Sequence, residues 1–141
     1  MFDGAWEFDQ DISGWDVSSV TTMKNMFKGT NQFDQNIGAW DVSSVTNMEG
    51  MFENANEFDR SIGAWDVSRV TDLSYVFCAS IFRLYNSDGT FTDSTSLGCN
   101  PACARFNEDI NNWDVGQVTN MDSTFARLTG FNQPLAAWNV G

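Results

Sequence analysis

Carboxylates recur at one position of a repeated pattern, and they are the residues of this chain best placed to do chemistry. Each follows a tryptophan in the string Trp-Asp-Val, and the row comprises Asp16, Asp41, Asp66 and Asp114, with Asn139 in the last copy. If the copies stack about 4.8 Å apart, neighbouring carboxylates repel by roughly 1 kcal/mol even in water. Two compensations stay open. Either nearby serine hydroxyls (Ser18, Ser43, Ser68) or backbone amides donate to the carboxylates, or the row binds Ca²⁺ or basic side chains.

Catalysis is a poor explanation of this row. Paired carboxylates can hydrolyse glycosidic bonds, but the acid and the base need unlike environments, and here the copies are alike. The chain also has no histidine, which removes Ser–His–Asp and Cys–His sites. We therefore expect a protein that is not an enzyme and needs no cofactor, with Ca²⁺ as the ion that the row would suit.

The three cysteines are the second group with chemistry. Cys78, Cys99 and Cys103 lie at the ends of a polar segment, about 79–102, that does not follow the repeated pattern. If this segment is an insertion, the positions that flank it lie close enough for a disulfide. We predict a Cys78–Cys103 bond, with Cys99 as the alternative partner, worth roughly 3 kcal/mol. Such a bond would suit an exported protein.

The charge of the chain restricts its partners. It has 19 acidic and 7 basic residues and a net charge of −12. A nucleic-acid binder needs a basic footprint, so we expect no nucleic acid, and we expect no anionic membrane surface either. No segment reaches the roughly 18 apolar residues that span a bilayer. A basic protein partner fits the charge best.

The elements that position these residues follow a 25-residue period. Trp15, Trp40 and Trp65 are 25 residues apart, and Trp113 and Trp138 resume the period after a gap of 48, which implies an insertion of 23. The chain is then one repeat solenoid, whose coils span about 8–32, 33–57, 58–105 (with the insertion at about 79–102), 106–130 and a partial 131–141.

The apolar columns within one coil predict a strand and a helix. Trp40 and Val42 share one face of a strand, while Val45, Met48, Met51 and Phe52 have helical spacing. The column Thr21, Thr46, Thr71 and Thr119 is interpreted as helix N-caps rather than as an ice-binding row. The fold class expected is therefore an α/β repeat solenoid, leucine-rich-repeat-like, with one short strand and one short helix per coil. Stacking would bury the tryptophan column, so we do not expect a sugar-binding surface there.

The string Trp40-Asp41-Val42-Ser43-Ser44-Val45-Thr46-Asn47-Met48-Glu49-Gly50-Met51-Phe52 resembles the repeat of BspA-like leucine-rich-repeat surface proteins. The resemblance covers the chain apart from the insertion. It implies a cell-surface or extracellular protein that acts in adhesion or protein binding, and it carries no catalytic residues. The alternatives are a structural spacer in a surface layer and a cation-binding solenoid.

Neither end of the chain has the polar cap that a solenoid usually needs. Met1 and Phe2 align with Met26 and Phe27, inside a repeat unit, and Val140-Gly141 stops just past a predicted strand. We therefore expect either a fragment of a longer array or end-to-end association of copies.

Overall fold

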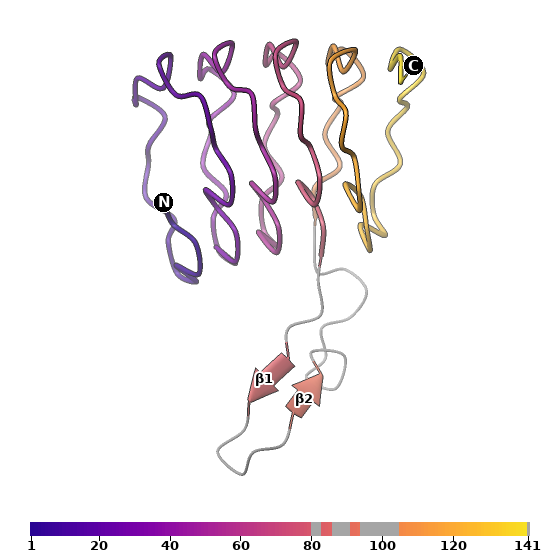
Figure 1. The fold of residues 1–141 in the computed structure, drawn as a ribbon. Helices are drawn as coiled ribbons and strands as arrows, with labels where there is room; N and C mark the ends of the chain where they lie inside the picture. Colours follow the sequence, from indigo (N-terminus) through magenta and orange to yellow (C-terminus); the bar gives the residue numbers. More distant parts are fainter. Residues whose placement is uncertain (80–82, 86–90, 94–104, 141) are drawn as a thin grey trace.

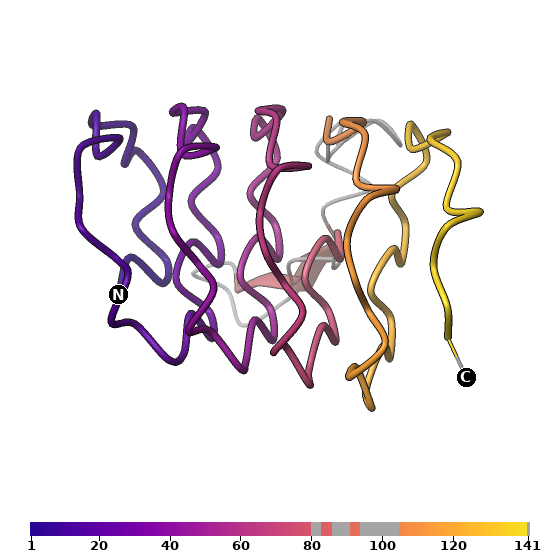
Figure 2. The same cartoon turned by 90° about the horizontal axis from the view of Figure 1, so that it is seen from above.

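The computed structural model describes residues 1–79, 83–85, 91–93 and 105–140. The chain winds into a stack of similar coils that follow the repeat, and its two termini lie at opposite ends of the stack (Figures 1 and 2). The named strands are β1 (Arg83–Tyr85) and β2 (Phe91–Asp93). They pair antiparallel, with Arg83 opposite Asp93, and they lie away from the stack, within the predicted insertion (Figure 1).

The segment of each coil that was expected to be a helix is a run of overlapping turns. In coil one the N–H of Met26 donates to the carbonyl of Met23, and that of Lys28 donates to Asn25. Asn25 and Gly29 have left-handed φ values of 53° and 68°. A helix needs right-handed backbone at every residue, so a left-handed residue at every fourth position prevents it.

The α/β prediction is therefore wrong. Among the described residues there is no helix, and the two short strands β1 and β2 lie outside the coils. The sequence pattern predicted which positions are buried. The spacing of apolar residues does not indicate whether the backbone φ is negative, as in a helix, or positive, as at these turns. The same left-handed positions recur in later coils at Gly50, Asn54, Tyr75, Ser123 and Arg127.

The turns leave alternate N–H groups free to bind the next coil. The N–H groups of Met23, Asn25, Phe27 and Gly29 donate to carbonyls of coil two at 2.7–2.9 Å, and coils two and three repeat the arrangement. A helix would use these N–H groups within one coil. The turn segment instead divides them between the coil and its neighbour, so each coil is bonded to the next along its length.

The expected strand at Trp40–Val42 is also absent. The N–H of Trp40 donates to Ile37 and that of Val45 donates to Val42, so two four-residue turns occupy this part of the coil. Where the structure describes the coils, they pair in parallel only through single-residue bridges, which join Thr22 to Asn47, Asn47 to Asp72 and Asp72 to Asn120. A strand requires consecutive pairs, and the turns on either side interrupt them.

The threonine column does not cap helices. The hydroxyl of Thr46 donates to the carbonyl of Thr21 at 3.1 Å, and the backbone N–H of Thr46 donates to the same oxygen at 2.8 Å. Thr71 and Thr119 repeat this contact with the coil before them. Both donors of each threonine therefore join consecutive coils, which corrects the capping interpretation.

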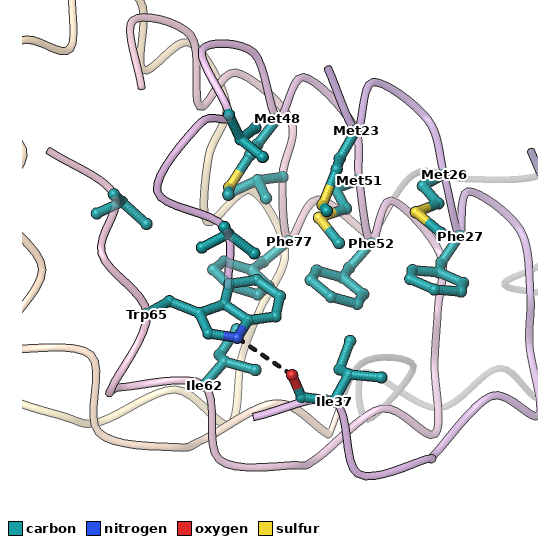
Figure 3. Packing of buried hydrophobic residues seen from close by; sticks show 14 of the residues in the cluster. Met23, Met26, Phe27, Ile37, Met48, Met51, Phe52, Ile62, Trp65 and Phe77 are labelled. Carbon is teal, nitrogen blue, oxygen red and sulfur yellow. Dashed lines mark hydrogen bonds between the residues drawn. The ribbon is translucent and has the colours of Figure 1, made fainter. Parts of the chain in front are cut away.

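Stacked aromatic side chains form the core. One column contains Phe27, whose ring lies 5.7 Å from that of Phe52, and a second contains Phe33, 5.8 Å from Phe58. The two columns face each other, because the rings of Phe27 and Phe33 are 4.1 Å apart. Figure 3 shows the first phenylalanine column beside the methionines that fill the space above it. Each such ring pair contributes about 0.5–1.5 kcal/mol beyond the burial of its area.

The tryptophan column adds a polar contact inside the core. The Nε1–H of Trp65 donates to the carbonyl of Ile37, one coil earlier, at 3.2 Å (Figure 3). Trp40, Trp113 and Trp138 make the equivalent bond. Trp65 is 4% exposed, so its N–H would have no water to replace this carbonyl. The bond fixes both the tilt of the indole and the register of the two coils.

Trp65→Phe removes this donor but keeps an aromatic ring in the column. We expect the free energy of unfolding to fall by about 1–3 kcal/mol, because the carbonyl of Ile37 loses its partner in the core. Urea denaturation of the variant and the wild type measures the difference. Trp15→Phe is the matched control, since Trp15 is 42% exposed and its replacement should change stability little. Equal losses at the two sites would contradict this account.

Gly50→Ala tests the left-handed turn. Gly50 has a φ of 60°, and an added Cβ would collide with the side-chain oxygen of Asn25 and lie 3.3 Å from Glu53 Oε2. We expect a loss of stability of about 1–2 kcal/mol from the backbone alone. Gly14→Ala is the control, because a Cβ there meets nothing within 4 Å. Thermal unfolding followed by circular dichroism should show a lower Tm for the first variant only.

Candidate functional site

The row of aspartates lies on the outside of the stack. Asp16, Asp41, Asp66, Asp114 and Asn139 are all exposed. In coil two the neighbours on either side are buried, since Trp40 is 5% exposed and Val42 is 1% exposed. The two buried side chains fix the backbone, so the residue between them points to solvent. The stack thus places one carboxylate per coil on a common outer surface.

Serine side chains hold the carboxylates in place. Asp41 Oδ1 accepts from the hydroxyl of Ser43 at 2.6 Å and from its backbone N–H at 3.1 Å. Asp16 has the same two bonds to Ser18. These are local turns in which a side chain accepts from the backbone two residues on.

The other two aspartates also accept from a backbone N–H two residues on. Asp66 Oδ1 accepts from the N–H of Ser68 at 3.1 Å, and Asp114 Oδ1 accepts from the N–H of Gly116 at 3.0 Å. The first of the two compensations considered from the sequence is therefore present. These hydrogen bonds engage Oδ1 of each carboxylate. The second compensation, binding of an external cation, stays a prediction.

Hydrogen bonding lowers the pKa of three row carboxyls, those of Asp16, Asp41 and Asp66. The hydroxyl of Ser43, and then its N–H, holds the pKa of Asp41 below its ordinary value of 3.8, against smaller contributions from repulsion by Asp66 and Asp16. The pKa values of Asp16 and Asp66 are lowered by Ser18 and Ser68 in the same way. These three carboxylates therefore stay ionised at neutral pH, and they form a fixed line of negative charge.

A second column of acidic side chains was missed by sequence reasoning. Asp34 Oδ1 accepts from the N–H of Asp59, one coil later, at 3.0 Å. The same contact runs from Asp9 to Asp34, from Asp59 to Asn107 and from Asn107 to Asn132. These side chains join coils, so they are structural. The signal in the sequence was an Asp or Asn directly after the first phenylalanine of every coil.

Within the described part of the chain, four ion pairs also connect neighbouring coils. Two join Lys24 to Glu49 at 2.5 Å and Lys28 to Glu53 at 2.8 Å. The others, Arg60–Asp34 and Arg105–Glu57, are 2.7 Å long. None of them includes a carboxylate of the outer row. The more exposed pairs, such as Arg105–Glu57, add little stability, about 0–1 kcal/mol each. All four pairs engage basic side chains away from the row.

The predicted disulfide falls largely outside the described residues. Cys78 is buried and forms no disulfide with a described residue, and burial raises the pKa of its thiol above the ordinary value of 9.0. Cys99 and Cys103 lie outside the part of the chain that the structure describes, so a bond from either to Cys78 stays a prediction.

Two findings concern metals and membranes. Among the residues that the structure describes, no three Cys, Asp or Glu side chains come together in a way that could hold a metal ion. In the same residues, no helix is long and apolar enough to cross a membrane.

Ser43→Ala tests the origin of the lowered pKa. We expect the pKa of Asp41 to rise toward 3.8, measured by NMR titration of its carboxyl carbon. A carboxyl with a lowered pKa stabilises the fold above the unfolded-state pKa, and this contribution is lost as the pH falls through the folded-state pKa. The variant should therefore differ from the wild type least in strong acid. Ser44→Ala, which removes a hydroxyl that does not bond Asp41, should leave this pKa unchanged.

Comparison with known proteins gives one family. A family model described as "Mycoplasma protein of unknown function, DUF285" matches residues 1–97 and 98–141. The division between the two matches falls inside the segment of about 79–102 that departs from the repeat. No curated protein and no solved structure matches the chain. Because the matches extend over both sides of the insertion, the chain belongs to the DUF285 family of Mycoplasma proteins of unknown function.

Proposed function

We propose that this chain is a non-catalytic protein-binding or adhesion module, and that the outer row of Asp16, Asp41, Asp66 and Asp114 is its docking surface for a basic partner. The observation that carries the proposal is the position of the row. All four carboxylates are exposed. The pKa values of Asp16, Asp41 and Asp66 are held low, and Asp114 lies in the same kind of local turn. A fixed line of negative charge attracts a basic surface over a long range.

Preorganisation supports this proposal. A free aspartate side chain loses rotamer freedom when it binds, which weakens association. Here the bonds from Ser18 and Ser43 already hold the carboxylates of Asp16 and Asp41 in one orientation. These bonds use Oδ1, and Oδ2 of both carboxylates takes no part in them. A partner would therefore meet side chains that need little further ordering.

The uniformity of the row argues against an enzyme. Asp16, Asp41 and Asp66 have the same local partner and the same direction of pKa shift. General acid and base groups need environments that push their pKa values apart. The lack of histidine in the chain supports the same conclusion from the sequence.

The place of action is proposed from the sequence. The Trp-Asp-Val-Ser string and its repetition resemble the repeats of BspA-like surface proteins, which supports a location at the cell surface or outside the cell. The net charge of −12 makes a basic protein the favoured partner, rather than a nucleic acid or an anionic membrane.

The double variant Asp41→Asn with Asp66→Asn tests the docking surface. The immobilised 141-residue chain is used to recover proteins from cell-surface extracts, with and without Ca²⁺. We expect the affinity for a basic partner to fall about tenfold in the variant, because each exposed charge pair contributes up to about 1 kcal/mol. Binding should also weaken as salt is added.

The matched control changes the net charge equally but leaves the row intact. Asp3→Asn with Glu108→Gln removes two negative charges at positions outside the row. If the control weakens binding as much as the row variant, general charge and not the row attracts the partner. If the row variant binds as tightly as the wild type, the proposal is wrong.

A further inference from the structure

One position of the turn segment has a left-handed backbone in each of the four coils. The residues there, Asn25, Gly50, Tyr75 and Ser123, have φ values between 53° and 60°. Asparagine and glycine adopt this conformation readily, whereas a bulky side chain strains the backbone. Tyrosine is therefore an unfavourable choice for the fold at this position. A strained residue that the structure retains points to a use other than folding.

Tyr75 also exposes an apolar surface in the middle of the stack. It is 38% exposed, whereas Gly50 is buried and Asn25 and Ser123 are half-buried. Coils lie on both sides of Tyr75, so its exposure is not that of an uncovered layer. Among the described residues, the other exposed large apolar side chains belong to the outermost layers of the stack: Met1, Trp6, Trp15 and Val140.

Asp122, in the next coil, holds Tyr75 at two points. The backbone N–H of Tyr75 donates to the carbonyl of Asp122 at 2.9 Å, and its phenol donates to Asp122 Oδ2 at 3.2 Å. The ring is thus held in one orientation with a carboxylate at its rim. The hydrogen bond to Asp122, and then the charge of this carboxylate, raises the pKa of the Tyr75 phenol. The electrostatic field at the ring is therefore negative.

The charge of Asp122 is not neutralised by an ion pair, unlike that of its equivalent in coil two. Glu49, the equivalent residue, forms an ion pair with Lys24 of coil one. The residue of coil three that corresponds to Lys24 is Ser74, and the ion pairs within the described residues leave out Asp122. The surface therefore presents a carboxylate beside an exposed aromatic ring, and a cation would complement both.

We propose that Tyr75 and Asp122 form a binding site for one lysine or arginine side chain of a protein partner. The face of a tyrosine ring attracts a cation that lies within about 6 Å of its centroid. Asp122 adds a full negative charge at the rim of the same ring. Binding needs little further ordering, because Tyr75 is already bonded to Asp122 at both ends. The site is separate from the outer row, and it rests on the proposed function only in its choice of a basic partner.

Tetralysine is the probe for this site, and its fully Nε-acetylated form is the neutral control. Tyr85→Phe leaves Tyr75 as the single tyrosine of the chain, so its ring signals in a proton–carbon NMR spectrum are assigned directly. In this background, tetralysine should shift the ring signals saturably. Its ε-methylene protons should also give nuclear Overhauser effects to the ring. A neutral peptide that acts equally, or a ring that does not respond to tetralysine, overturns the proposal.

Asp122→Asn tests the carboxylate. We expect tetralysine binding, measured at the Tyr75 ring, to weaken by about threefold. Asp41→Asn is the matched control, because it removes the same charge from the outer row and should weaken binding at this site less. If the two substitutions weaken binding equally, net charge attracts the peptide and the proposal is wrong. Because the measurement is made at Tyr75, failure of this site and failure of the outer row are distinguishable.

Tyr75→Asn separates binding from a structural role. Asparagine adopts a left-handed φ readily, so the Tm of the variant should be no lower than that of the wild type. The upfield shift that the ring causes in the ε-methylene protons of tetralysine should disappear. A lower Tm would show that Tyr75 serves the fold through its bond to Asp122. A peptide shift that persists would place the cation elsewhere, and either result overturns the proposal.

Discussion

The fold depends on one constraint, which is that the polar groups of each coil find their partners in the neighbouring coil. Alternate backbone N–H groups of the turn segment, the indole N–H groups and the threonine hydroxyls all bond across coils. A buried polar group without a partner costs about 1–3 kcal/mol, so a single coil could not keep this conformation. The aromatic columns follow from the same register, because it places like side chains over one another.

The sequence predicted which residues are buried but not how the backbone turns. The 25-residue period and the phenylalanine and tryptophan columns were readable, because burial depends on side-chain chemistry. The helix was wrongly predicted, because the apolar spacing of Val45, Met48 and Met51 also suits successive turns. Glycine at position 50 hinted at left-handed backbone, but Tyr75 and Arg127 adopt it as well. For such residues the stack, rather than local preference, imposes the conformation.

The outer row was predictable for a similar reason. When a tryptophan and a valine both point into the core, the side chain between them points to solvent. The exposure of Asp41 and Asp66 therefore follows from the pattern. The pattern does not show which donors bond the carboxylates, because that depends on the turn at Ser43. In sequence, the structural column of Asp34 and Asp59 resembles the outer row, since both place a polar or acidic residue at a fixed position of each coil. Only its bonds to the next coil distinguish the two.

Coil three shows what this construction allows over evolutionary time. After its interruption the chain returns to the same register, since Thr119 donates to Thr71 at 2.9 Å and Phe125 stacks on Phe77. Contacts between neighbours alone are therefore sufficient to restore the pattern. A gene that duplicates one period would add a coil without redesigning the others, and exposed positions could then diverge freely. Duplications or deletions of whole periods can therefore change the length and the outer surface of such a protein, whereas similar changes would unfold a globular domain.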